Sequence, residues 1–135
     1  MQMMKYNLLF LAFAVLLFSG CHRTTLEDLA AKTAEEYTER YCPTPVENGQ
    51  RTDSVTFSRE THTFGYYYSL SGKVDDASII QSNKQQIIST ILSSLKENTS
   101  MKDYKQAGYS FRYVMKSSKT GDVLIDKTFT NKDYK

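Results

Sequence analysis

The feature that most constrains the fold of this chain is a short aromatic run with a period of two. In the segment FGYYYSL, every second residue from Phe64 to Leu70 is large and apolar. Successive side chains of a β-strand point to opposite faces, so this period predicts a strand with one buried face and one open face. Gly65, Tyr67 and Ser69 occupy the predicted open face.

Three other segments show the same alternation. Val55 and Phe57 form a short run before the aromatic one, and residues 59–63 between the two runs are polar. Residues 109–116 and 123–129 alternate again, and the intervening Lys-Thr-Gly-Asp sequence is typical of a hairpin turn. The sequence therefore predicts two β-hairpins, neither of which is stable alone, because isolated two-stranded ribbons are marginal in water.

Two helices are predicted from apolar residues that recur at intervals of three and four. The first covers residues 26–41, with Thr24 or Thr25 as its N-terminal cap and with Pro43 just beyond its end. The second covers residues 76–98, where isoleucine and leucine side chains mark one face.

The order α-β-β-α-β-β indicates an α+β fold. The economical arrangement joins both hairpins into one four-stranded antiparallel sheet and packs both helices on the face that carries Phe64 and Tyr66. The opposite face would then stay open to solvent. The polar tail, residues 131–135, is expected to be frayed.

The first 20 residues predict an export signal. Lys5 supplies positive charge, Leu8 to Phe18 is an unbroken run of eleven apolar residues, and Ser19-Gly20 offers a small-residue cleavage point. The run is too short for a membrane-spanning helix, which needs about 20 apolar residues.

The segment Leu17-Phe18-Ser19-Gly20-Cys21 resembles the lipobox of bacterial lipoproteins, although Phe18 stands where that family usually has leucine. The resemblance implies cleavage between Gly20 and Cys21 and a diacylglycerol thioether on the Cys21 sulfur. Each buried acyl methylene contributes about 0.8 kcal/mol, so two or three chains approach permanent attachment to a lipid bilayer. The alternative is ordinary secretion, with Cys21 free or disulfide-bonded to Cys42.

These patterns divide the chain into a signal peptide (1–20), a lipidated tether (21–24) and a single α+β domain (25–135). His22, rather than Asp, follows the cysteine. Among lipoproteins of this type, that favours the outer membrane over the inner one. We therefore expect a lipid-anchored protein of the cell envelope, at the outer membrane and facing the periplasm.

Charge excludes one class of partner. From Cys21 onward the chain has 16 Lys and Arg residues against 15 Asp and Glu. A nucleic-acid-binding surface needs a strong basic excess, so no nucleic-acid partner is expected.

Catalytic signatures are missing from the sequence, including the G-x-S-x-G elbow, the H-E-x-x-H pair and the phosphate-binding P-loop. Cys42 is interpreted as a buried small apolar residue, with an interchain disulfide or a reactive thiol as the alternatives. His62 is interpreted as a solvated turn residue rather than as an acid-base or metal partner of Glu60. We expect no enzyme activity, no cofactor and no metal site.

The candidate binding surface is the predicted open face, on which Tyr67, Ser69, Arg112 and Lys116 lie together. An exposed tyrosine beside an arginine is typical of recognition surfaces. The domain resembles the small α+β lipoproteins of unknown function in Gram-negative envelopes, and in architecture it resembles periplasmic inhibitor and pilot-type lipoproteins. The sequence thus predicts a non-catalytic envelope lipoprotein that binds a protein partner through this face. The alternative is a small-ligand or glycan-binding module with Tyr67 as a stacking platform.

Overall fold

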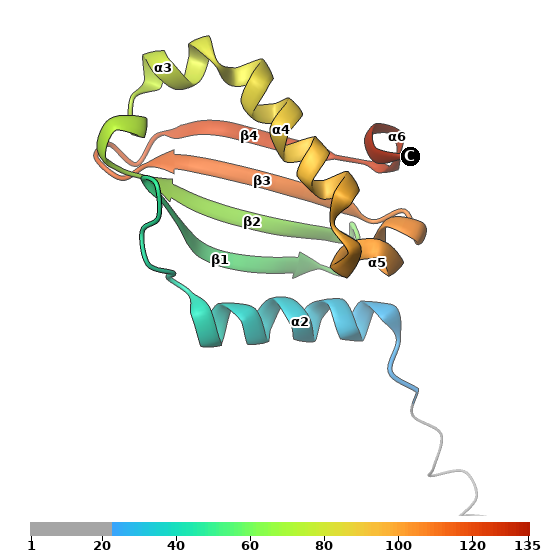
Figure 1. The fold of residues 1–135 in the computed structure, drawn as a ribbon. Coiled ribbons are helices and arrows are strands. Elements are labelled where there is room, and N and C mark those ends of the chain that lie inside the picture. Colours follow the sequence, from blue (N-terminus) through green and yellow to red (C-terminus); the bar gives the residue numbers. More distant parts are fainter. Residues whose placement is uncertain (1–22) are drawn as a thin grey trace, which may run out of the picture.

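The structure is a computed structural model that describes residues 23–135. The predicted signal peptide, its cleavage after Gly20 and the lipidation of Cys21 lie outside these residues. The main elements, in chain order, are α2 (Leu26–Tyr41), β1 (Gln50–Ser58), β2 (Thr63–Leu70), α3 (Ala77–Ser82), α4 (Lys84–Glu97), α5 (Lys102–Gln106), β3 (Ser110–Ser117), β4 (Val123–Phe129) and α6 (Asn131–Tyr134) (Figure 1).

The four strands form one sheet in the order β1-β2-β3-β4. Both predicted hairpins are present, because β1 pairs antiparallel with β2 and β3 pairs antiparallel with β4. The central pair is parallel, however, with Thr63 opposite Ser110 and Leu70 opposite Ser117. The α+β class is confirmed, but the prediction of an all-antiparallel sheet was wrong, since the sheet is mixed.

The connection between β2 and β3 explains the parallel pairing. Its longest element, α4, has 14 residues and crosses the sheet in Figure 1. A helix of that length spans about 21 Å, and a strand of eight residues spans about 26 Å. The helix therefore returns the chain almost to the end of the sheet at which β2 began, so β3 starts beside the first residue of β2.

The core lies on one face of the sheet, as predicted. Phe64, Phe111 and Phe129 are completely buried there, and Ala30 and Ala34 of α2 pack into the same cluster. Small residues on α2 allow the helix to approach the sheet closely. Figure 1 shows α2 running along the edge strand β1 while α4 lies over the middle of the sheet.

Two segments depart from the sequence prediction, one within the second predicted helix and one in the tail. The helix expected over residues 76–98 is divided at Asn83 into α3 and α4, and the side chain of Asp76 caps α3 by accepting from two backbone N–H groups. The tail that was expected to fray forms α6, whose Tyr134 hydroxyl donates to the Tyr109 carbonyl at 2.6 Å.

Candidate binding surfaces on both faces of the sheet

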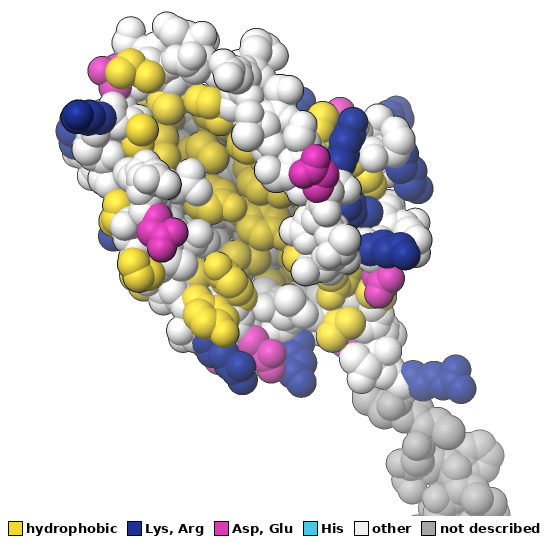
Figure 2. All heavy atoms as spheres, viewed as in Figure 1, with side chains coloured by type: hydrophobic (Ala, Val, Ile, Leu, Met, Phe, Trp, Pro, Cys, Tyr) yellow, Lys and Arg dark blue, Asp and Glu magenta, His cyan; other side chains and the backbone are white. Residues whose placement is uncertain are grey.

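A groove lies between α2 and α4, with the sheet as its floor. It encloses about 340 Å³, and Figure 2 shows the apolar floor exposed at the centre of this face. We call it the tyrosine groove. Its principal lining residues are Tyr37, Val55, Tyr66, Tyr68, Met101 and Tyr113.

The floor of the groove is a stack of tyrosine rings. Tyr66 and Tyr113 are paired across the parallel strands, and their ring centroids lie 4.9 Å apart. The ring of Tyr68 is also parallel to that of Tyr113, at 6.5 Å. Alternation along β2 and β3 puts all three rings on the core face, but neither helix covers them completely.

The hydroxyl groups of these tyrosines stay neutral. Burial raises the pKa of Tyr113 to about 12, and burial together with the neighbouring tyrosines raises the pKa values of Tyr66 and Tyr68 further. The Tyr66 hydroxyl donates to the Met101 sulfur at 3.8 Å. Within the described chain, no residue hydrogen-bonds to the hydroxyls of Tyr68 and Tyr113. Every buried side-chain oxygen of the described residues has a partner, so these two unpartnered hydroxyls are not buried. They therefore reach the groove and can hydrogen-bond to an occupant.

The groove continues into a second hollow of about 680 Å³ at the carboxyl end of α2. Tyr37 and Thr52 line both spaces. Tyr41 extends the apolar wall, and its ring packs against that of Tyr37 at 5.2 Å. Among the described residues that line the two hollows, Glu47 alone is charged.

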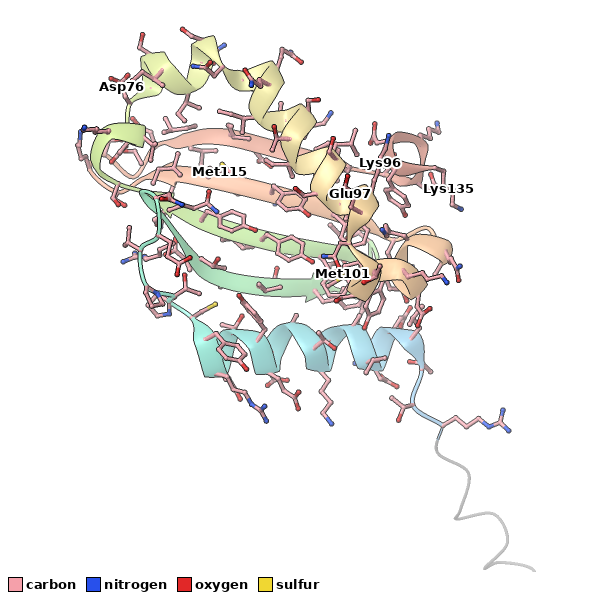
Figure 3. The ribbon with its side chains drawn as sticks, in the orientation of Figure 1. Asp76, Lys96, Glu97, Met101, Met115 and Lys135 are labelled. Atoms are coloured by element: carbon pink, nitrogen blue, oxygen red, sulfur yellow. The ribbon has the colours of Figure 1, made fainter. Side chains whose placement is uncertain are left out.

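The turn after α4 borders the opposite end of the groove. Met101 lies there, and Figure 3 shows it below the last turn of α4, which carries Lys96 and Glu97. The groove therefore runs from an end bounded by a methionine to an end that carries a carboxylate.

The four residues predicted from sequence lie on the other face of the sheet, and the structure brings them together. Gly65 is paired with Arg112, and Ser69 is paired with Lys116. Tyr67 borders two shallow hollows, one of about 440 Å³ that includes Arg112 and one of about 200 Å³ that includes Lys116. No helix of the described chain covers this face in Figure 1.

Two of these four residues are engaged by neighbours. Ser69 is buried, and its hydroxyl donates to the Asp53 carboxylate at 2.5 Å, so it supports the face without being presented on it. Arg112 makes two bonds to Asp126, at 2.7 and 2.9 Å. Asp126, and to a smaller extent Tyr67, raise the pKa of Arg112, while Arg112 lowers the pKa of Asp126. Whether this face binds a protein stays a prediction.

His62 and Cys42 are positioned by their neighbours. His62 contacts the Glu27 carboxylate rather than Glu60, and its ring stacks on Tyr109 at 4.9 Å, so it joins the β1–β2 turn to α2. Cys42 follows α2 as a half-buried free thiol, and burial is the first cause of its raised pKa. A raised pKa disfavours the reactive thiolate form.

The described residues can also be examined for a metal site and for a membrane-spanning helix. Residues 23–135 hold no cluster of three or more His, Cys, Asp or Glu side chains suited to a metal ion. Within the same residues, no helix has the length and apolar character needed to cross a membrane.

Sequence reasoning missed the tyrosine groove. The alternation placed Tyr66, Tyr68 and Tyr113 on the core face, and from there complete burial is the natural inference. The signal that was available was the residue type: three tyrosines at adjacent core positions bring three hydroxyls that need partners or water.

Comparisons with known proteins identify the fold. A candidate secreted protein from Pseudomonas aeruginosa has a TM-score of 0.64 at 16% identity, over 84% of this chain and 100% of that one. The pilotin EpsS from the Vibrio vulnificus type 2 secretion system has a TM-score of 0.60 at 16% identity, over 82% and 92%. The type II secretion system pilotin AspS from Vibrio cholerae has a TM-score of 0.57 at 18% identity, over 80% and 91%. At these identities the likeness shows a shared fold.

A family model matches most of the chain. The family described as Domain of unknown function (DUF8479) matches residues 25–125. No curated protein matches the chain.

Proposed function

We propose that this chain, which belongs to the DUF8479 family, is a non-catalytic, lipid-anchored protein of the cell envelope that binds an amphipathic segment of a protein partner in the tyrosine groove. The fold shared with two pilotins of type 2 secretion systems supports a role beside other envelope proteins. The lipobox-like segment that ends at Cys21 supports attachment to a bilayer, at the outer membrane and facing the periplasm.

The observation that carries this proposal is the uncovered aromatic floor between α2 and α4. Tyr37, which lines the groove, is 40% exposed, and Tyr41, which lines the adjoining hollow, is 58% exposed. Tyrosine offers a large contact area, a polar tip and a small loss of side-chain entropy on binding. An amphipathic helix that lays its apolar face into such a groove is a recurring mode of peptide recognition.

The chemistry of the groove favours binding over catalysis. A general acid or base needs a pKa near the working pH, and burial moves those of Tyr66, Tyr68 and Tyr113 far above it. Cys42 has a raised pKa as well, which removes support for a nucleophilic thiol.

The groove suits a protein partner better than the open face does. The groove is concave and lined mainly by aromatic and aliphatic side chains, whereas hydroxyl-bearing residues predominate in the larger hollow of the open face. Apolar area removed from water is the main source of binding free energy between proteins. Glu47 at one end of the groove further favours a partner segment with Lys or Arg at the corresponding end.

Site-directed photo-crosslinking in intact cells tests the proposal. A photoreactive phenylalanine analogue replaces Tyr37, Met101 or Tyr67 in turn, and mass spectrometry maps the partner peptide that is captured. We expect Tyr37 and Met101 to capture the same apolar segment of one partner, with a basic residue nearer to the Tyr37 end.

A matched pair of variants provides the control. Tyr37→Ala in the groove should abolish capture from Met101, whereas Ile79→Ala, which changes a similarly exposed apolar residue on α3, should leave it unchanged. Capture from Tyr67 alone would instead place the partner on the open face. The absence of capture from both groove positions would refute the proposed function.

A further inference from the structure

The open face of the sheet, opposite the tyrosine groove, contains a second recessed surface. Its larger hollow, of about 440 Å³, lies over β1, β2 and β3 and reaches Thr128 of β4. Five Thr and Ser side chains line it, and these are Thr56, Ser58, Thr61, Thr63 and Thr128. Tyr67 separates it from the smaller hollow beside Lys116.

Gly65 leaves room on this surface for the ring of Tyr67. A Cβ atom at Gly65 would lie 2.6 Å from the Thr56 hydroxyl oxygen and 2.9 Å from Cε2 of Tyr67. The ring of Tyr67 therefore folds back along its own strand over Gly65, an arrangement in which an aromatic side chain shields a strand glycine. A ring held along the sheet surface is a platform for stacking.

Among the described residues, Arg112 alone brings a positive charge to the larger hollow, and that charge is already neutralised. Arg112 is held by both oxygens of Asp126, so the pair brings donors and acceptors to the site with no net charge. The charge of the site therefore complements an uncharged ligand, and bound phosphate or carboxylate would compete with Asp126 for the guanidinium.

We propose that this open face is a second binding site, and that it takes an uncharged oligosaccharide. The apolar face of one sugar ring stacks on Tyr67, and its hydroxyls exchange hydrogen bonds with the surrounding Thr and Ser side chains and with the Arg112–Asp126 pair. Sugars have this combination of an apolar face and a hydroxyl rim. The larger hollow is distinct from the tyrosine groove, since no described side chain lines both.

The test uses the complete mature protein and a panel of linear uncharged tetrasaccharides, namely β-1,4-linked N-acetylglucosamine, β-1,4-linked glucose and α-1,4-linked glucose. Binding is measured by calorimetry and by the amide chemical shifts of Gly65, Tyr67 and Arg112. We expect at least one tetrasaccharide to bind saturably and to shift these three amides. No binding across the panel would overturn the proposal.

Variants separate stacking from charge. Tyr67→Ala should weaken binding about tenfold or more, whereas Tyr67→Phe, which keeps the ring, should stay close to the unmodified protein. Asp126→Asn leaves the guanidinium without its neutralising partner, so this variant should gain affinity for inorganic phosphate. Sugar binding that survives Tyr67→Ala, or that is lost in the groove variant Tyr37→Ala, would contradict the assigned site.

Discussion

Thr38 is the residue through which α2 protects the free edge of the sheet. Its hydroxyl donates to the Val55 carbonyl at 2.7 Å and accepts from the Val55 N–H at 2.8 Å. β1 has β2 on one side only, so these two backbone groups have no strand to pair with. One side chain thus satisfies a donor and an acceptor that would otherwise invite pairing with another chain.

Thr38→Val should therefore destabilise the protein although it keeps the shape of the side chain. Both backbone groups of Val55 lose a partner in a half-buried position, and the expected loss is about 1–2 kcal/mol in the free energy of unfolding. Urea denaturation measures it. Thr38→Ser keeps the hydroxyl and should recover most of the stability, and equal losses in the two variants would refute the role of the hydroxyl.

Asp28 gives the molecule an acid-dependent contribution to stability. Its carboxylate accepts from Arg59 at 2.8 Å and closes the capping box with Thr25. Arg59 first, and then Thr25, lower the pKa of Asp28 from 3.8 to about 2. Because the folded-state pKa is below the unfolded-state one, the stabilisation is complete above about pH 4 and is lost as the pH falls toward 2.

Asp28→Asn should accordingly lower the melting temperature at pH 6, and the difference from the unmodified protein should shrink as the pH falls from 4 to 2. Thermal unfolding followed by circular dichroism across this range measures the difference. A difference that stays constant with pH would attribute the effect to packing or capping rather than to charge.

The short helix α6 shows how one element at the end of the chain completes the core. The Tyr134 hydroxyl reaches the carbonyls of Tyr109 and Lys105, and its ring meets Phe111 edge-on at 5.8 Å. These contacts bind α6 to the turn that precedes β3, so the last residues of the chain are held by the core.

Tyr134→Phe should cost about 1 kcal/mol of unfolding free energy, because it removes the hydroxyl and keeps the ring. Lys132→Ala, on the exposed side of the same helix, should change stability little, and urea denaturation compares the two. A neutral Tyr134→Phe would show that the ring alone holds α6.

The structure shows which elements can be predicted from local sequence and which cannot. All four strands and α2 could be predicted from hydrophobic period, because the period directly reports which face of an element is buried. The parallel joint between β2 and β3 could not, since the period does not identify the neighbouring strand. The capping pattern of α6, in which Thr130 and Asp133 bond reciprocally, was present in the sequence but was outweighed by the polar composition of the tail.

The two candidate sites also differ in how far they could be predicted from the sequence. Tyr67 and Arg112 could be predicted to share the open face, because alternation alone decides the face of a strand residue. Their closeness depends on the pairing of β2 with β3, which alternation does not give. The tyrosine groove depends on the distance between α2 and α4, and that distance depends on side chains from distant parts of the chain. Ala30 and Ala34 bring α2 close to β1, while α4 lies over the middle of the sheet and contributes Leu95 to the same core cluster.

At the scale of the whole molecule, a single sheet separates two surfaces of different chemistry. The helical side offers the tyrosine groove, which suits an apolar segment, and the open side offers hydroxyl groups and a neutral ion pair. Because no described side chain lines both the groove and the larger open-face hollow, occupancy of one need not exclude occupancy of the other. If the chain is anchored at Cys21 as proposed, the two surfaces would allow it to contact a partner and a glycan at the same time.

Lipid attachment at Cys21 would fix both the mass of the protein and its membrane fraction. If Cys21 carries two or three acyl chains, each methylene contributes about 0.8 kcal/mol to membrane partitioning, and the protein should stay in the membrane fraction after washing with high salt. The intact mass of protein expressed in a Gram-negative host should equal the chain from Cys21 plus the acyl groups. Cys21→Ser should abolish both properties, because serine offers no thiol for the thioether.

Cys42→Ser is the matched control for this experiment. Cys42 is a free thiol on the folded domain, so its loss removes a sulfur without touching the proposed anchor. This variant should keep the acylated mass and the membrane fraction of the unmodified protein. A bare thiol at Cys21, or a Cys21→Ser variant that stays membrane-bound, would contradict lipid anchoring, and retention of the protein would then have to come from a partner bound to the folded domain.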